Sequence, residues 1–185
     1  MVEESIIWST PEEIEEELDD LRHNHPEWNE RMFLHWAADT YLRIDNARRS
    51  GKLDLVKHFM TGSCFDRLEK ELEEQGGFLD LKPLDLQGVQ IEKIGEEGVN
   101  DFIDVRFVSE REKTLLVEHY RFIRPRYEEA AGFGASRTSG DVCPHCGAKI
   151  ILADDWECEY CGTILAEQSV GWTIEAIMKE GEYAG

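Results

Sequence analysis

The first apolar residues of the chain recur at the spacing of a helix. Thr10-Pro11 has the features of a helix start, a side chain that can cap the backbone followed by a proline at the first helical position. Ile14, Leu18 and Leu21 then form one apolar stripe, while glutamate and aspartate occupy most of the remaining positions. The pattern predicts an acidic helix within residues 1–25 whose charged side chains lie in solvent.

A longer and more aromatic helix is predicted next. Apolar residues recur every three or four positions from Pro26, which is placed to open the helix, to about Arg49, and Gly51 is placed to end it. The rings on this helix are expected to belong to the core, with the lining of a pocket as the alternative. Two shorter helices are predicted, one at 53–60 and one that Ser63 caps and a glycine pair ends.

Beyond these helices the apolar residues alternate with polar ones, which is the period of a strand. The four predicted strands lie at 86–94, 103–107, 115–124 and 170–177. Because the helices come first and the strands follow one another, the pattern predicts an α+β fold with the helices packed on one side of an antiparallel sheet.

The third and fourth predicted strands are far apart in the sequence. Residues 127–142 are rich in glycine, alanine and serine, a composition typical of a linker. A cysteine-bearing segment at 143–168 follows, so it is an insertion before the last strand. The predicted organisation is an acidic N-terminal helix (1–25), an α+β domain (26–126 and 169–180), the linker (127–142) and the insertion (143–168).

Four of the five cysteines form two Cys-x-x-Cys pairs in this insertion. They are Cys143, Cys146, Cys158 and Cys161. A glycine follows the second cysteine of each pair, where a metal-gripping turn needs a residue that tolerates a positive φ. The spacing predicts a zinc ribbon that holds one structural Zn²⁺ per chain, because four thiolates fill a tetrahedral shell. A dithiol redox site, two disulfides and iron in place of zinc are the alternatives.

Charge and hydropathy limit the classes of partner. The formal net charge is −20 over 185 residues, which disfavours binding to nucleic acid or to anionic membranes. Within the cysteine segment Lys149 is the one lysine or arginine, so the ribbon lacks the basic residues of a nucleic-acid module. The chain has no apolar run of membrane-span length and no recognisable secretory signal, so a cytoplasmic protein is expected.

Several of these segments together resemble the Tim-forty-four-like domain family, named after the scaffold subunit of the mitochondrial import motor. The strand Glu118-His-Tyr-Arg-Phe-Ile-Arg124 resembles the family's E-x-W-x-F-x-R strand, with tyrosine in place of tryptophan. Trp172 with Ile174 and Ile177 resembles its closing strand, and residues 33–54 resemble its first long helix and the turn after it. Some bacterial members similarly carry a zinc ribbon just before the last strand. Many members carry an upstream membrane-anchoring or targeting segment, which is not expected here.

The resemblance covers about residues 26–178 and implies a fold and a function. The implied fold is nuclear transport factor two-like, a curved antiparallel sheet around helices with an apolar cavity. The residues expected at the cavity are Phe33, Trp36, Tyr41, Tyr120 and Trp172. Members of the family are regarded as scaffolds or binding modules rather than enzymes. The implied partner is a protein or an apolar ligand, with a link to transport.

Two further functions fit the same fold class. A small-molecule isomerase or dehydratase would need a buried carboxylate or histidine opposite a hydrogen-bond donor. The candidate bases are Asp104, Glu118, His119, His35 and Asp39, and the candidate donors are Tyr41 and Tyr120. None of them lies in a recognisable catalytic motif, so a non-enzymatic protein is predicted. A structural subunit of a homo-oligomer or a larger assembly is the other alternative.

Overall fold

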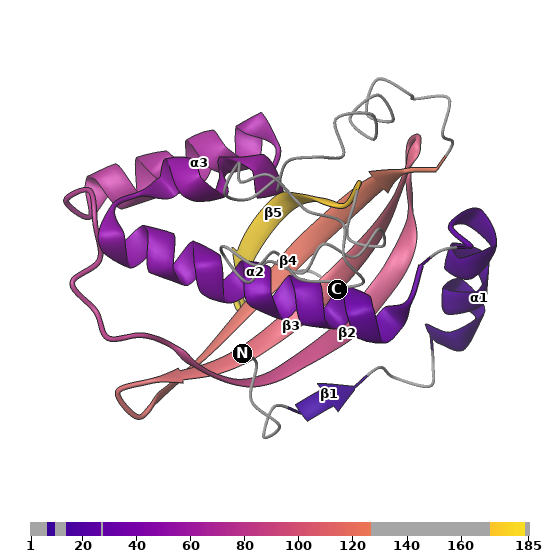
Figure 1. Cartoon of the computed structure of the whole chain (residues 1–185), viewed down its shortest axis with the longest axis horizontal. Helices are drawn as coiled ribbons and strands as arrows, with labels where there is room; N and C mark the ends of the chain where they lie inside the picture. The colour runs from indigo at the N-terminus through magenta and orange to yellow at the C-terminus, as the bar shows by residue number, and fades with distance from the viewer. Residues whose placement is uncertain (1–6, 10–13, 27, 127–170, 184–185) are drawn as a thin grey trace, which may run out of the picture.

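The helices precede four of the five strands of a single sheet in the computed structural model, which describes residues 7–9, 14–26, 28–126 and 171–183 (Figure 1). In chain order the elements are β1 (Ile7–Ser9), α1 (Glu15–Asn24), α2 (Glu30–Ser50), the 3-10 helix η2 (Leu53–Phe59), α3 (Gly62–Glu74), β2 (Asp85–Glu97), β3 (Asn100–Arg111), β4 (Thr114–Pro125) and β5 (Thr173–Lys179). The predicted linker, the four paired cysteines and the Thr10 cap lie outside the described residues.

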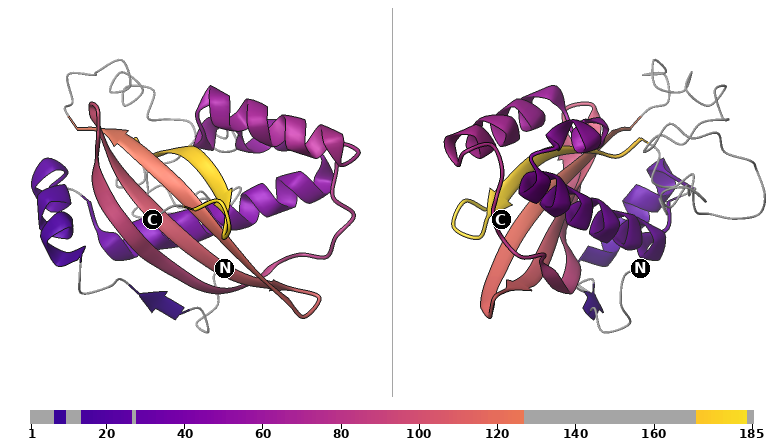
Figure 2. Two further views of the ribbon diagram at one scale, coloured as in Figure 1. Left: turned by 180° about the vertical axis from the view of Figure 1, so that it is seen from behind. Right: turned by 60° about the vertical axis from the view of Figure 1, so that its left-hand side comes forward.

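The strands form one sheet in the order β1-β2-β3-β4-β5. All pairs from β2 to β5 are antiparallel, and β1 pairs in parallel with residues 88–90 of β2 at the edge. Helices α2 and α3 cover the same face of the sheet, which we call the inner face (Figure 2). The predicted α+β class and the four antiparallel strands are therefore confirmed, whereas β1, only three residues long, was not predicted.

Two tight hairpins fix which side chains face the helices. Gly98 takes a positive φ of 60° in the two-residue turn between β2 and β3. The turn between β3 and β4 places Glu112 and Lys113 at φ values of 50° and 68°, a conformation that side chains with a Cβ rarely adopt. With this register, Val105 lies opposite Tyr120 on the inner face, and side chains one position along point to the outer face.

The helix ends differ from the predictions by a few residues. Helix α2 begins at Glu30 rather than at Pro26, because the Asn29 side chain caps it by accepting a hydrogen bond from the Met32 N–H at 3.1 Å. Its end at Gly51 is confirmed, with that glycine at φ 69°. Helix α3 is capped by Thr61 rather than Ser63, since the Thr61 hydroxyl accepts from the backbone N–H at position 64.

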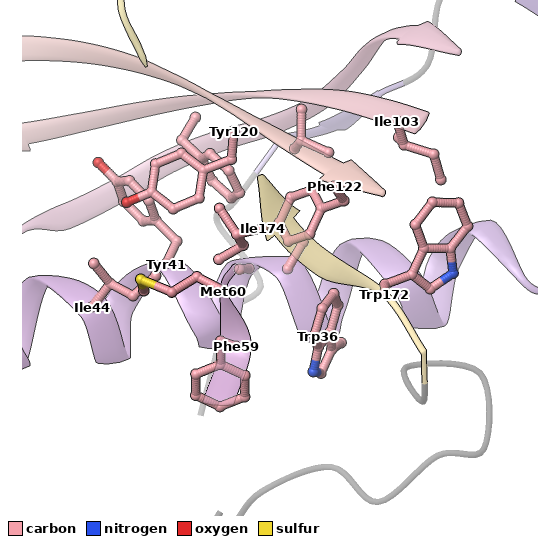
Figure 3. Close-up of a cluster of buried hydrophobic side chains, with 14 of the residues drawn as sticks. Trp36, Tyr41, Ile44, Phe59, Met60, Ile103, Tyr120, Phe122, Trp172 and Ile174 are labelled. Atoms are coloured by element: carbon pink, nitrogen blue, oxygen red, sulfur yellow. The ribbon is translucent and has the colours of Figure 1, made fainter. Parts of the chain in front are cut away.

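The core lies between α2 and the inner face of the sheet. Figure 3 shows side chains from α2, β3, β4 and the region of β5 pointing toward one another across this space. Phe33, Ile44, Ile103 and Ile174 each have an exposed fraction of 0 %. Leu18 and Leu21 of α1 belong to the same buried cluster, so the apolar stripe of the acidic helix is also covered. None of the helices in the described part of the chain combines the length and hydropathy needed to span a membrane.

Strand β5 is the element that returns after the insertion. It pairs with β4 through residues 173–179, and its start is also held from the helical side. The Thr61 N–H donates to the Ile174 carbonyl at 2.9 Å, and Met60 forms an isolated parallel bridge with Ile174. The last strand thus connects the sheet to the beginning of α3.

Candidate functional site

The five aromatic residues expected at a cavity lie together in the core. Phe33, Trp36, Tyr41, Tyr120 and Trp172 have exposed fractions between 0 % and 5 %. Their rings are in contact, with centroid distances of 5.5 Å between Phe33 and Trp172 and 5.4 Å between Tyr41 and Tyr120. Residues from α2, β4 and the start of β5 therefore converge on one aromatic cluster, which is densely packed.

Phe122 connects the two halves of this aromatic cluster and was not among the expected site residues. Its ring lies 5.4 Å from both Phe33 and Trp36 and 6.4 Å from Tyr120. The strand alternation contained the signal, because residue 122 is two positions beyond Tyr120 and so faces the same side of the sheet.

One end of the aromatic cluster is polar. The Tyr41 hydroxyl lies 2.9 Å from the Ser109 hydroxyl, and Arg48 Nη1 donates to Glu118 Oε1 at 3.0 Å. Figure 3 shows the hydroxyls of Tyr41 and Tyr120 side by side at this end. The Tyr120 hydroxyl is completely buried and has no hydrogen-bond partner among the residues that the structure describes. We call these five residues the inner polar cluster.

Both phenols of the inner polar cluster stay protonated far into the alkaline range. Burial raises the pKa of Tyr41 well above its ordinary value, and the nearby Glu118 carboxylate raises it further. Burial raises the pKa of Tyr120 in the same way, again with a contribution from Glu118. The two hydroxyls can therefore donate hydrogen bonds at neutral pH, whereas neither serves as a phenolate base.

Arg48 and Ser109 belong to the cluster but were not singled out from the sequence. Arg48 follows Tyr41 and Ile44 at the spacing of one helix face, so its position beside the core was predictable. Glu118, by contrast, is one of the candidate bases predicted from the sequence, and it faces the same side of the sheet as Tyr120, two positions further on.

The other candidate bases lie away from this cluster. Asp104 is on the outer face, where Arg121 Nε and Nη2 donate to its two carboxylate oxygens at 2.8 Å each. His119 is also on the outer face, with Nδ1 2.7 Å from Glu92 Oε2. Asp39 on α2 accepts a hydrogen bond from Arg43 of the next turn at 2.5 Å. Both carboxylates are thus already engaged by arginine side chains.

His35 lies one turn before Asp39 and is half-buried. Burial lowers its pKa below the ordinary value, and the positive charge of Arg31 contributes in the same direction. The neutral imidazole is therefore favoured at physiological pH, but the structure does not bring His35 into the inner polar cluster.

The described residues on either side of 127–170 are fixed to the folded domain. Arg126 donates from Nε to Asp101 Oδ1 at 3.1 Å and forms an ion pair with Glu96 at 3.0 Å. His25 Nε2 lies 2.8 Å from the other oxygen of the buried Asp101. The His25 ring also packs edge-on against Trp172, with centroids 5.8 Å apart. Residues on either side of the cysteine segment are thus held in one network.

The sequence-predicted metal ligands cannot be placed, because all four lie outside the described residues. Within the described ranges, no group of three or more histidine, cysteine, aspartate or glutamate side chains is arranged to hold a metal ion. The remaining cysteine, Cys64, is buried in the core with an exposed fraction of 2 %.

The two buried tyrosines are expected to respond differently to loss of the hydroxyl. Tyr41→Phe removes the hydrogen bond to Ser109 and should lower the free energy of unfolding by about 1 kcal/mol. Tyr120→Phe removes a buried hydroxyl that lacks a described partner and should raise stability by about 1 kcal/mol. Urea unfolding followed by tryptophan fluorescence measures both, and equal losses in the two variants would contradict the assignment.

Comparison with known proteins found no matching family model, no matching curated protein and no matching solved structure.

Proposed function

We propose that this chain is a non-enzymatic binding or scaffold protein of the Tim-forty-four-like kind. On this proposal the sheet has the curvature of the nuclear transport factor two-like fold, and the chain binds a protein segment or an apolar ligand in the cytoplasm, with the packed aromatic cluster as the rigid support of the binding surface. The observation that carries the proposal is the convergence of five aromatic residues, from segments far apart in sequence, on one buried cluster.

The cysteine segment serves this domain as a structural zinc ribbon. Thiolates are soft ligands that suit Zn²⁺, and four of them leave no open position for a reacting water. A unit of this size cannot bury enough apolar surface to fold without a staple, and metal binding supplies the missing free energy. Arg126 and Trp172, which flank the linker and the ribbon, are both held against the domain, and this supports a ribbon that stays close to it.

An isomerase or dehydratase is the second candidate function. The inner polar cluster supports it, because two tyrosine hydroxyls lie beside the Glu118 carboxylate at the end of an apolar interior. The ion pair with Arg48 weighs against it, since one carboxylate oxygen of Glu118 is already occupied by the guanidinium. An assembly subunit is the third candidate, in which the ribbon would extend an interface.

The ribbon is tested by replacing Cys143 and Cys146 together with serine. We expect one zinc per chain in the unchanged protein and none in the double variant, because two thiolates cannot complete the shell. The near-ultraviolet circular dichroism of the core should persist in the variant, since its aromatic cluster lies in the α+β domain. Elemental analysis and native mass spectrometry measure the metal content and any co-purified ligand or oligomer.

Cys64→Ala is the matched control, because Cys64 is a buried cysteine of the core rather than a member of the two pairs. It should retain the zinc. A metal-free native protein whose four paired thiols all react freely would contradict the ribbon. A pull-down from the native host with the double serine variant and with Cys64→Ala distinguishes the two binding surfaces. A partner that is lost only from the zinc-free double variant binds the ribbon. A partner that both variants retain binds the α+β domain.

A further inference from the structure

The residues that follow β5 fold back over the outer face of the sheet. The Glu182 N–H donates to the Lys179 carbonyl at 2.8 Å, and the Lys179 N–H donates to Glu182 Oε2 at 2.9 Å. These two bonds close a turn that directs the chain toward β4 and β3. The outer face is the one that the view from behind presents, with α2 and α3 on the far side (Figure 2).

Tyr183 makes the main contact of this returning segment. Its ring stacks flat on the imidazole of His119, with centroids 4.2 Å apart and an interplanar angle of 2°. Its hydroxyl donates to Asp104 Oδ2 at 3.2 Å. Burial raises the pKa of the Tyr183 phenol, and the Asp104 charge raises it further, so the phenol remains a hydrogen-bond donor. The ring and the hydroxyl are therefore recognised by two different groups.

These groups are held in place by partners other than Tyr183. Asp104 has an exposed fraction of 0 %, and Arg121 donates a hydrogen bond to each of its carboxylate oxygens. The Nδ1 atom of His119 lies within hydrogen-bond distance of Glu92. Asp104 and His119 lie on the neighbouring strands β3 and β4, inside the sheet rather than at its edge. Positions on paired central strands are rigid, so the two contact groups keep their places when the tyrosine leaves.

The acidic residues before Tyr183 add weaker contacts. Glu180 Oε2 lies 3.8 Å from His119 Nε2 and 4.0 Å from Arg106 Nη2. The Glu180 side chain is 62 % exposed, so these ion pairs contribute little to stability. Arg106 is also paired with Glu92 at 3.7 Å, so these contacts orient Glu180 without selecting for the charge of the segment. Because the segment is held by one ring, one hydroxyl and weak ion pairs, its release requires little free energy.

We propose that Asp104 and His119, with Arg106 beside them, form a binding site for the tyrosine of a returning segment, a surface that we call the tyrosine dock. The dock holds residues 180–183 of its own chain, and it accepts the same segment from a second copy of the protein when its own segment is released. The proposal is independent of the ribbon and of the aromatic inner face.

The test uses a chain that lacks residues 180–185 and a fluorescent peptide with the sequence of residues 179–185. We expect the peptide to bind the truncated protein at least about tenfold more tightly than the full chain, because the tethered segment competes at an effective concentration in the millimolar range. Fluorescence anisotropy measures both affinities. Equal or undetectable binding by the two proteins, with the circular dichroism of the truncated protein unchanged, would overturn the proposal.

Two substitutions make the test specific. A peptide with phenylalanine in place of Tyr183 should bind the truncated protein about five- to tenfold more weakly, because it cannot donate to Asp104. The truncated protein carrying His119→Ala should lose most of its binding. If the truncated protein does not fold, the full chain with Tyr183→Ala replaces it, since this variant keeps the backbone and empties the dock. Failure of the Tyr183→Ala chain to bind the peptide better than the unchanged chain would likewise overturn the proposal.

Discussion

Replacing Glu118 with glutamine is expected to lower the free energy of unfolding by about 3 kcal/mol, because it leaves a charged guanidinium without its carboxylate in the protein interior. The Arg48 and Glu118 side chains are each only 15 % exposed, and they lie beside two buried phenols. Glutamine keeps nearly the volume of glutamate, so the loss reports the charge rather than a cavity. Urea unfolding followed by tryptophan fluorescence measures the effect.

A double variant with Arg48→Met removes both charges and should recover most of this loss, leaving a deficit of about 1 kcal/mol. Glu97→Gln is the exposed control. Glu97 also pairs with an arginine, Arg121, but its side chain is 63 % exposed, and the expected loss is below about 0.5 kcal/mol. Equal losses in the Glu118 single variant and the double variant would show that the interior pair is not coupled.

The same Glu118 variant separates the two leading functions. If the chain is a binding protein, Glu118→Gln changes its stability and its retention of ligand, and neither the variant nor the unchanged protein turns over a substrate. If a small-molecule reaction is found, and the folded variant loses it while keeping substrate affinity, the carboxylate is a catalytic base. That result would favour the isomerase or dehydratase over the scaffold.

Phe33→Ala is expected to cost about 3–5 kcal/mol of unfolding free energy, the range for removing a large aromatic side chain from a packed core. The Phe33 ring has an exposed fraction of 0 % and contacts the rings of Trp36, Phe122 and Trp172. Its removal opens a space at the point where α2, β4 and the start of β5 meet. Thermal and urea unfolding measure the loss.

Phe78→Ala is the matched control for this substitution. Phe78 has an exposed fraction of 54 % and lies between α3 and β2, so its loss should change stability by no more than about 0.5 kcal/mol. A loss of unfolding free energy below about 1 kcal/mol for Phe33→Ala would contradict a packed cluster. It would favour a solvent-filled cavity, because truncating a side chain that lines such a cavity removes few contacts.

The long periodic segments of this chain were predictable from the sequence. The aromatic helix was recognised because residues such as Phe33, Tyr41 and Ile44 recur with the helical period and all face the sheet. Its start was placed at Pro26 because proline is common at the first turn, but the cap that forms belongs to Asn29. Local signals of this kind compete, and here the hydrogen bond between the Asn29 side chain and the Met32 N–H sets the start of the helix.

The tight turns and the outer face were not predictable in the same way. Glu112 and Lys113 adopt positive φ values that favour glycine or asparagine, so the β3–β4 turn has no local sequence signature. The Asp104–Arg121 pair depends on the strand register, and the contact of Tyr183 with His119 also depends on the turn after β5. Such clusters arise from pairings that a single segment does not reveal.

The bridge between Met60 and Ile174 also bears on how the two borders of the sheet meet other molecules. A strand at a border presents unpaired amide and carbonyl groups that can recruit a strand from another chain and begin aggregation. Met60 and Thr61 occupy the border of β5 at Ile174, and β1 occupies part of the border of β2. These contacts cover part of each border and so reduce the strand edge that another chain could pair with. Because α2 and α3 cover the inner face, the outer face is the broad surface of the sheet that is left for a partner.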